Sequence, residues 1–474
     1  MKLPIFSKAM PRVLEPAFFS PPQLCPRAGE VEKGKEAASP TQRSVGRFTF
    51  VTLLFLALPS HATTTLPALL AEAYATHPAL RMQRGLGDAA QAGIEGARWQ
   101  FYPTPSVAIE QANAGSGDVN YDGDSRIAVF RLQQPVWTGG RLTGNLNKAE
   151  AGALIAQADY ESTRQQVAIR LVQAWGEGLT AQAKLRALEK SEQAHARLLD
   201  LVKRRAGNGF SAQADIELAR ARLDATRSEV TNARVQRDTA LARLTSLVGR
   251  PLPKDSLPEP GDPAAIDKEI QGVALESLLD MAWQASPQRL KSEAQVNQVE
   301  AEIEVANAAL WPEVYLRAER QYGSYSVAGM PPQNRLFIGL NTALGAGLSA
   351  QSTIDAARAR LRAYREDMLT QRLAVVEQVN IDHSLVGAAV ERRASLQRSL
   401  ASNVEVTTSW ERQFLAGRKQ WQDLMNAARE QATAEAQLAD SVGAEIVSRW
   451  RRLVLTRGID TILDGVVAPK GAQP

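Results

Sequence analysis

The residues with the greatest potential for catalysis or metal binding are few and scattered. His77, His195 and His383 lie far apart, none belongs to an HExxH or Cys–His pattern, and Cys25 is the only cysteine. A zinc site needs three or four such ligands at defined spacings. We therefore expect no metal site, and we expect His195 and His383 on helix surfaces or between helices.

Two glycine-rich stretches match nucleotide-binding loops only in part. Residues 29–36 lack the Ser or Thr that follows the lysine of a phosphate loop. Gly85 and Gly87 lie in a helical pattern with no strand before them, unlike the glycines of a dinucleotide site. Paired carboxylates occur only where helical stretches carry surface charge. The sequence thus predicts no cofactor and no enzyme active site.

The positive charge of the chain is concentrated near its N-terminus. The net charge is +4, and residues 1–62 hold eight Lys or Arg and four Glu, which leaves the remainder neutral. Proteins that bind nucleic acid usually carry a basic surface. We therefore expect no nucleic-acid partner.

The end of this basic region has the features of a secretory signal peptide. An apolar run at 48–58 follows Arg43 and Arg47 and precedes the small-residue site Ser60-His61-Ala62. The run is too short to span a bilayer. A buried core helix is the alternative, but no amphipathic pattern surrounds the run. We expect the mature chain to begin near Thr63.

The Pro-rich segment 1–42 does not resemble the start of a signal peptide. We interpret it as a mis-assigned upstream extension, with Val45 as a candidate start. Once Cys25 is removed, the mature chain has no cysteine to carry a lipid anchor. No later stretch of about eighteen apolar residues is present, so an integral membrane contact would require a β-barrel.

A long helical hairpin dominates the middle of the first half. From Arg141 to Ala206 the sequence predicts one helix of about 100 Å, followed by a tight turn at 207–210 and a returning helix to Val248. The returning helix carries a seam with three- and four-residue spacing, as in coiled coils: Ile216, Ala219, Leu223, Thr226, Val230, Ala233, Arg237, Ala240, Leu244 and Leu247. Its many small residues indicate that partner helices lie along its length.

The chain repeats this plan once. The landmarks recur with offsets of 207 to 209 residues: His77-Pro78 with Ser286-Pro287, Tyr102-Pro103 with Trp311-Pro312, Gly140 with Gly347, Gly209 with Gly417, and Asp215 with Asp423. Such a constant offset indicates an internal duplication. We assign 63–248 to the first repeat, 249–272 to a Pro-rich connector, 273–465 to the second repeat and 466–474 to a tail.

Within each repeat, shorter helices match the long one in length. From Leu66 to about Trp99 the periodicity predicts one helix of about 50 Å, with Pro78 just inside it, and the return arm 212–248 spans about 55 Å. Placed end to end, the two would form a column as tall as the long arm.

Four segments have the alternation of β-strands. Two lie at 104–112 and 126–137, and the clearest alternation places Val314, Leu316, Ala318, Leu336, Ile338 and Leu340 on one face and Tyr315, Arg317 and Glu319 on the other. A membrane barrel and a soluble sheet with one buried face both fit this pattern. Four strands cannot close a barrel, so a barrel would need several chains: two give eight strands and three give twelve.

These features together resemble the TolC family of bacterial outer-membrane channels. The resemblance covers nearly all of 63–465 and rests on HPAL (77–80), SPQR (286–289), QPVWTGGR (134–141), GNGFSAQADIELARA (207–221) and AGRKQWQDLMNA (416–427). It implies a mainly α fold with a small β-barrel contribution, assembled as a homotrimer in outer-membrane lipid. Twelve strands would form a shared barrel, and twelve helices a periplasmic α-barrel. A periplasmic adaptor would join this duct to an inner-membrane ABC transporter or proton-driven pump.

The resemblance also assigns roles to residues of the hairpin tips. Asp423 matches an acidic gate residue, whereas Asn426 stands where a second acidic residue is often found, so we expect a weaker charge ring. Lys419 and Asp215 match a latch between the two hairpins, and Phe414 replaces a hydrogen-bonding aromatic. The alternative is that these are solvated turn residues contributing about 0–1 kcal/mol.

The tip turns themselves suggest two further roles. We expect Gly209 and Gly417 to end the long helices with positive φ. Phe210 and Trp421 either dock an adaptor or staple the turn internally, and the sequence leaves both readings open.

The leading functional prediction is a passive outer-membrane exit channel. Its cargo is open between type I secretion of a protein and tripartite drug efflux, and the QPVWTGGR form together with the missing lipid anchor favours secretion. A periplasmic coiled-coil scaffold without a pore is the alternative from another class. It would explain the seams, but not the signal peptide together with four strands.

Overall fold

The computed structural model describes residues 65–113, 118–254, 256–342 and 349–460. The chain divides into Met1–Ser60 and His61–Pro474, and only the second unit is described below. The expected signal peptide, Cys25, Gly347 and the tail 466–474 lie outside the described residues.

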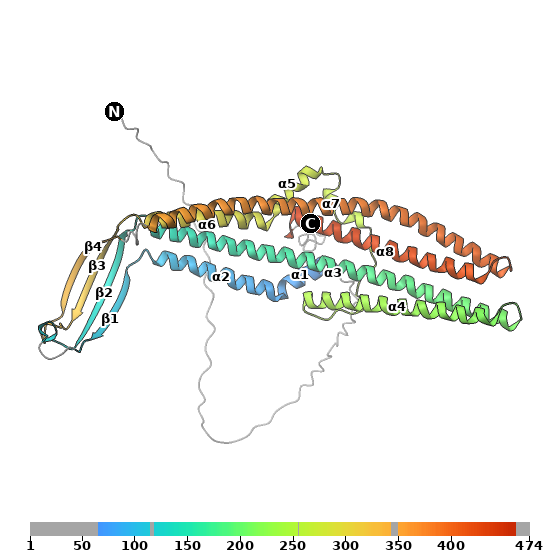
Figure 1. The fold of residues 1–474 in the computed structure, drawn as a ribbon, viewed down its shortest axis with the longest axis horizontal. Helices are drawn as coiled ribbons and strands as arrows, with labels where there is room; N and C mark the ends of the chain where they lie inside the picture. The colour runs from blue at the N-terminus through green and yellow to red at the C-terminus, as the bar shows by residue number, and fades with distance from the viewer. Residues whose placement is uncertain (1–64, 114–117, 255, 343–348, 461–474) are drawn as a thin grey trace, which may run out of the picture. The chain divides into compact units, whose positions relative to one another are not determined.

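The same order of elements occurs twice, as Figure 1 shows. The first half contains α1 (Leu66–Thr76), α2 (Pro78–Trp99), β1 (Thr104–Gln111), β2 (Arg126–Trp137), α3 (Arg141–Gly207) and α4 (Gln213–Val248). The second contains α5 (Leu275–Ala285), α6 (Pro287–Ala308), β3 (Glu313–Tyr322), β4 (Gln333–Asn341), α7 (Ser349–Leu415) and α8 (Trp421–Arg457). The expected duplication of helix, two strands and long hairpin is therefore confirmed.

The prediction of one helix from Leu66 to Trp99 is wrong. The helix is broken at His77, whose backbone is extended (φ −66°, ψ 124°), and Pro78 begins a new helix. A proline ring clashes with a helical conformation of the preceding residue, but proline itself suits the first helical position. The Nδ1 atom of His77 accepts a hydrogen bond from the Ala79 amide at 3.2 Å and so caps α2. Ser286 makes the equivalent break and cap between α5 and α6.

The long helix α3 lies at the centre of the helical layer. It packs against α2 and α6 near the strands and against α4 and α8 near the tips, while α7 packs on α6 and α8. The expected end-to-end arrangement of shorter helices along each long helix is confirmed. The seam of α4 is confirmed as well, because Ala219, Leu223, Val230 and Ala233 are all buried.

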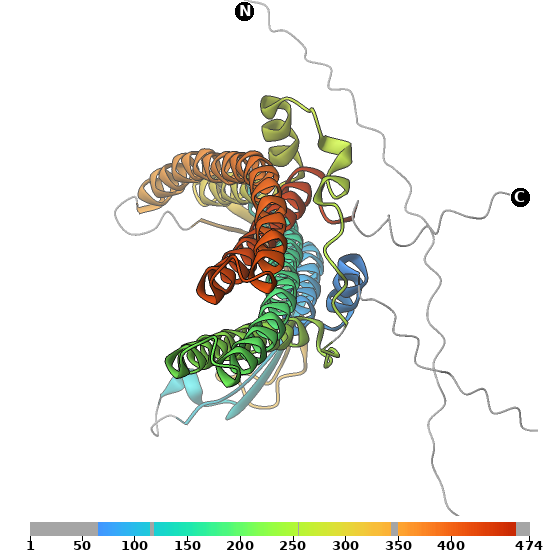
Figure 2. The same ribbon diagram turned by 90° about the vertical axis from the view of Figure 1, so that its right-hand side faces the viewer.

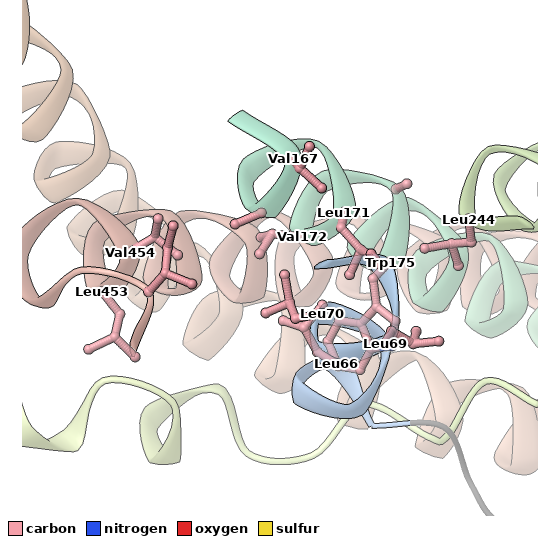
Figure 3. Packing of buried hydrophobic residues seen from close by; sticks show 14 of the residues in the cluster. Leu66, Leu69, Leu70, Val167, Leu171, Val172, Trp175, Leu244, Leu453 and Val454 are labelled. Carbon is pink, nitrogen blue, oxygen red and sulfur yellow. The ribbon is translucent and has the colours of Figure 1, made fainter. Parts of the chain in front are cut away.

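One hydrophobic cluster joins the short helices to the middle of the layer. Leu66, Leu69 and Leu70 of α1 pack against Leu171 and Trp175 of α3, as Figure 3 shows. The short helices α1 and α5 lie on the same side of the layer (Figure 2). Burying a leucine side chain contributes about 1.5–3 kcal/mol, so this cluster anchors the two halves to each other.

The strands form one antiparallel sheet in the order β1-β2-β3-β4. The pairing of β2 with β3 joins the two halves and contains a β-bulge between Pro135 and Trp137. Within one chain, β1 and β4 are the edges of this sheet. Among the described residues, no helix is long and apolar enough to cross a membrane.

Candidate functional site: a two-faced sheet and paired hairpin tips

One face of the sheet is apolar and exposed. Ile109, Leu336, Ile338 and Leu340 are 74%, 69%, 82% and 66% exposed, and the strand register places Leu316 opposite Ile338 on this face. An exposed apolar face of this extent indicates contact with lipid or with another protein. The alternation expected from the sequence is confirmed.

Aromatic rings lie where this apolar face meets the helices. Trp99, Tyr102, Trp137 and Trp311 are between 45% and 68% exposed. The ring centroids of Trp137 and Trp311 are 6.2 Å apart in an edge-to-face arrangement, and those of Trp99 and Tyr102 are 5.2 Å apart. The bulge brings Trp137 opposite Val314, on the apolar face. Tryptophan and tyrosine are enriched where a membrane meets water.

The opposite face of the sheet is polar and charged. The Glu319 carboxylate lies between two arginines: its Oε1 is 3.3 Å from Nε of Arg131, and its Oε2 is 3.4 Å from Nε of Arg317. The Glu319 side chain is only 9% exposed. The guanidinium of Arg317 also lies 4.6 Å from the centroid of the Phe337 ring. These contacts join three neighbouring strands, so the sheet has a chemically distinct second face.

The two hairpin tips have the same backbone geometry. Gly209 and Gly417 have φ values of 77° and 76°, and the positive φ expected for both is confirmed. In the first tip, the Phe210 amide donates to the Arg205 carbonyl at 2.8 Å. In the second, the Arg418 amide donates to the Gln413 carbonyl at 2.9 Å. This six-to-one hydrogen bond is the Schellman motif, which satisfies carbonyls at a helix end.

The tips lie side by side (Figure 1). A cluster of buried hydrophobic residues from both tips forms the contact between them. Phe414 and Trp421 are 3% and 6% exposed and belong to a cluster with Leu199 and Val202 of α3. The Arg205 guanidinium lies 4.9 Å from the centroid of the Phe414 ring, and its Nη1 donates to the Phe414 carbonyl at 3.4 Å. Phe414 is therefore a core residue of the tips.

The aromatic rings of Trp421 and Phe210, whose roles the sequence leaves open, differ in burial. Trp421 is buried and staples the second tip from inside. Phe210 is 75% exposed in one chain and presents its ring at the first tip. Of these two rings, only Phe210 is accessible to a partner.

The polar tip residues have partners within one chain. The Lys419 Nζ lies 3.4 Å from Oδ2 of Asp423 and 4.2 Å from the centroid of the Trp410 ring. Asp215 accepts a hydrogen bond from the Ala212 amide at 3.1 Å and contacts Gln422 of the second tip at 3.5 Å.

Asn426 is exposed one helical turn beyond Asp423. The latch between Lys419 and Asp215 stays a prediction, as does the gate role of Asp423 and Asn426.

His195 lies between helices, which is one of the two positions that the sequence predicts for it. It is 3% exposed, and its Nδ1 lies 3.2 Å from the Thr226 hydroxyl and 3.3 Å from the Ser191 hydroxyl. Burial lowers the pKa of His195 below the ordinary value of 6.5, while a hydrogen bond with the Met425 backbone opposes the shift. His195 thus links α3, α4 and α8 as a neutral ring.

A buried ionic network that the sequence does not predict joins the connector to α8. Asp267, in the connector between the halves, is fully buried and pairs with Arg449 at 2.6 Å and with Arg452. Arg449 also pairs with Glu445 at 2.9 Å. The sequence indicates a Pro-rich connector at 249–272, and no spacing in it relates Asp267 to α8. Among the described residues, no group of His, Cys, Asp or Glu is arranged to hold a metal.

Comparison with known proteins identifies relatives of this architecture. The family model described as "Outer membrane efflux protein" matches residues 69–250 and 278–450. The alkaline protease secretion protein AprF of Pseudomonas aeruginosa is 21% identical over 393 residues, which cover 81% of this chain and 80% of AprF.

Two further proteins match, one by sequence and one by structure. The proteases secretion protein PrtF of Dickeya chrysanthemi is 27% identical over 146 residues, 31% of this chain and 30% of PrtF. A crystal structure of CusC superposes with a TM-score of 0.70 at 17% identity, over 85% of this chain and 95% of that one.

Proposed function

We propose, because this chain belongs to the outer membrane efflux protein family, that it is the outer-membrane exit channel of a type I protein secretion system. Its family places it in the outer membrane, and its fold is that of channels such as CusC. The observation that carries the proposal is the sheet with one exposed apolar face, one charged face and two open edges.

The edges of the single chain support assembly with further copies. A sheet edge in lipid would leave backbone hydrogen-bonding groups unsatisfied, at a cost of several kcal/mol each. Three chains would supply twelve strands, enough for a closed barrel with a lumen. In that trimer the apolar face contacts lipid and the charged face lines the pore.

The helices support the same assembly. Both α3 and α7 have 67 residues, but α3 buries 22 of them and α7 only seven. Leu369 and Leu373 of α7 are 50% and 68% exposed. On the other edge of the layer, Met82 and Leu86 of α2 are 57% and 52% exposed. We infer that α7 of one chain packs against α2 and α4 of the next, as exposed apolar stripes on helices require partners.

The relatives favour protein as the cargo. AprF and PrtF are both described as proteins of protease secretion. We infer that this channel acts with an inner-membrane ABC transporter and a periplasmic adaptor, which would contact the exposed Phe210. The second candidate function is drug efflux with a proton-driven pump, which the name of the matching family favours.

Deletion of the gene in its own host distinguishes these functions. We expect a secreted protein to disappear from the culture medium while the minimal inhibitory concentrations of drugs stay unchanged. Complementation with the wild-type gene should restore secretion. Unchanged secretion with increased drug sensitivity would instead support efflux.

We further propose that Asp423 forms the periplasmic gate with Asn426, and that Asp215 and Lys419 hold it closed. The Asp215→Ala and Lys419→Ala variants should show higher single-channel conductance than wild type. Lys254→Ala is the control, since Lys254 pairs with Asp238 at 3.7 Å away from the tips. If all three variants have the same single-channel conductance as wild type, Asp215 and Lys419 do not form a latch.

A further inference from the structure

The charged face of the sheet carries more arginine than its partners neutralise. Arg131, Arg317 and Arg335 lie on three adjacent strands at the level of Glu319. Arg131 and Arg317 pair with the Glu319 carboxylate. Arg335 is the register partner of Glu319, but its guanidinium donates to Gln321 at 3.1 Å and to Gln333 at 2.6 Å. We call these three arginines and Glu319 the arginine cluster, which has a formal excess of two positive charges per chain.

Other charges on this face lie away from the cluster. Glu110 pairs in register with Ile127 near the far end of β1 and accepts a hydrogen bond from the Tyr325 hydroxyl at 3.3 Å. Glu313 lies at the helix end of β3 and pairs with Arg141. Within the described strands, the middle of the charged face therefore has Glu319 as its single carboxylate.

We propose that the arginine cluster makes the strand portion of the pore attract anions and favours negatively charged cargo. This inference rests on the proposed function, which places the charged face in the lumen of a trimer. Three copies would form a ring of nine arginines and three glutamates. Rings of charged side chains set the selectivity of pores, because they raise the local concentration of the opposite charge.

The side-chain chemistry defines the class of cargo. A guanidinium stays charged and binds carboxylate and phosphate groups through two parallel hydrogen bonds. Arg335 is exposed and is held by neutral amides, not by a carboxylate. Within the part of the chain that the structure describes, no carboxylate neutralises the positive charge of Arg335. The guanidinium can therefore attract an acidic polypeptide segment or another anionic solute that passes through the pore.

Ion selectivity of the full-length mature channel in planar bilayers tests the inference. In a potassium chloride gradient, Arg335→Gln should lower the ratio of anion to cation permeability about twofold, and Glu319→Gln should raise it by a similar factor. Arg320→Gln is the matched control. Arg320 follows Glu319 directly in β3, but its side chain lies over the Tyr322 ring on the apolar face of the sheet. This substitution should leave the ratio unchanged.

Block by inorganic tripolyphosphate gives a second measurement on the same channels. Added on the side of the strands, it should block wild type and Arg320→Gln at a lower concentration than Arg335→Gln. Equal permeability ratios and equal block in Arg335→Gln and Arg320→Gln would overturn the inference while leaving the channel function intact. Absence of conductance from all of the assembled variants and wild type would instead overturn the proposed function, and the inference with it.

Discussion

Gly176 on α3 and Gly443 on α8 face each other where the hairpins of the two halves meet. A Cβ atom at Gly443 would lie 1.8 Å from Oγ1 of Thr180, and one at Gly176 would lie 2.2 Å from Cγ2 of Val447. Helix backbones approach this closely only where no side chain intervenes. The contact between the two halves therefore depends on this glycine pair.

Adding a methyl group to this contact should destabilise the protein. We expect Gly176→Ala to cost about 1–3 kcal/mol, because valine is stiff in a helix and Val447 cannot easily turn away. Thermal unfolding in detergent measures the effect. Gly387→Ala is the control: nothing lies within 4 Å of a Cβ there, and the change should be neutral or stabilising by about 1 kcal/mol. Equal melting temperatures for the two variants would show that the helices are not in close contact.

The buried carboxylate of Asp267 should be essential for the fold around the connector. Asp267→Ala removes the carboxylate from the buried Arg452 and leaves the buried Arg449, which keeps its pair with Glu445, with one acidic partner instead of two. The substitution should cost about 3–5 kcal/mol. Asp262→Ala, in the same connector, removes a carboxylate that is 66% exposed and should change stability by less than about 1 kcal/mol. Chemical denaturation followed by circular dichroism compares the two. A smaller loss for Asp267→Ala than for Asp262→Ala would contradict the network.

The stability of the tip region should fall in mild acid because of His195. Its folded-state pKa lies below 6.5 owing to burial, so below pH 6.5 the unfolded chain binds the proton more readily than the folded one. The contribution of His195 to the free energy of unfolding is fully present above pH 6.5. It is lost as the pH falls toward the folded-state pKa, with a slope of up to about 1.4 kcal/mol per pH unit. Glu229 and Arg222 act on the ring with opposite signs and less strongly than burial.

The measurement is the melting temperature of wild type and His195→Gln between pH 7 and pH 5. The difference between the two should shrink or reverse as the pH falls, because glutamine does not titrate. A constant difference over this range would show that His195 does not titrate differently on unfolding.

Phe210 and Trp421 should respond differently to truncation. Trp421→Ala should lower stability by about 3–5 kcal/mol, since it empties part of the tip core. Phe210→Ala should leave the melting temperature unchanged and weaken binding of the proposed periplasmic adaptor, measured by pull-down of the purified pair. Unchanged adaptor binding in Phe210→Ala would remove the first tip from the docking surface.

Local signals in the sequence were sufficient for the hairpins and their turns. Gly209 and Gly417 punctuate unbroken helical patterns, and the seam through Ala219 and Val230 repeats every seven residues. The break at His77 differs from the single helix that the periodicity predicts, because Pro78 is the first residue of α2 and not an interior residue of a longer helix. The turns, the seam and the helix break all depend on residues that are close together in the sequence.

Contacts between the halves could not be derived in the same way. Trp421 is buried because Phe414 and the helix α3, about 200 residues earlier, cover it, whereas Phe210 has no such cover. Asp267 is buried because two arginines of α8 reach it. Such pairings depend on how the two repeats pack, and one sequence carries no period or motif for them.

We propose that three identical chains close one pore that a single chain cannot form. The most direct measurement is the mass of the purified mature protein in detergent, by analytical ultracentrifugation, combined with conductance of the same sample in a planar bilayer. We predict a particle of three chains that conducts ions. A stable single chain in detergent that gives no conductance would show that the protein is not a trimeric channel.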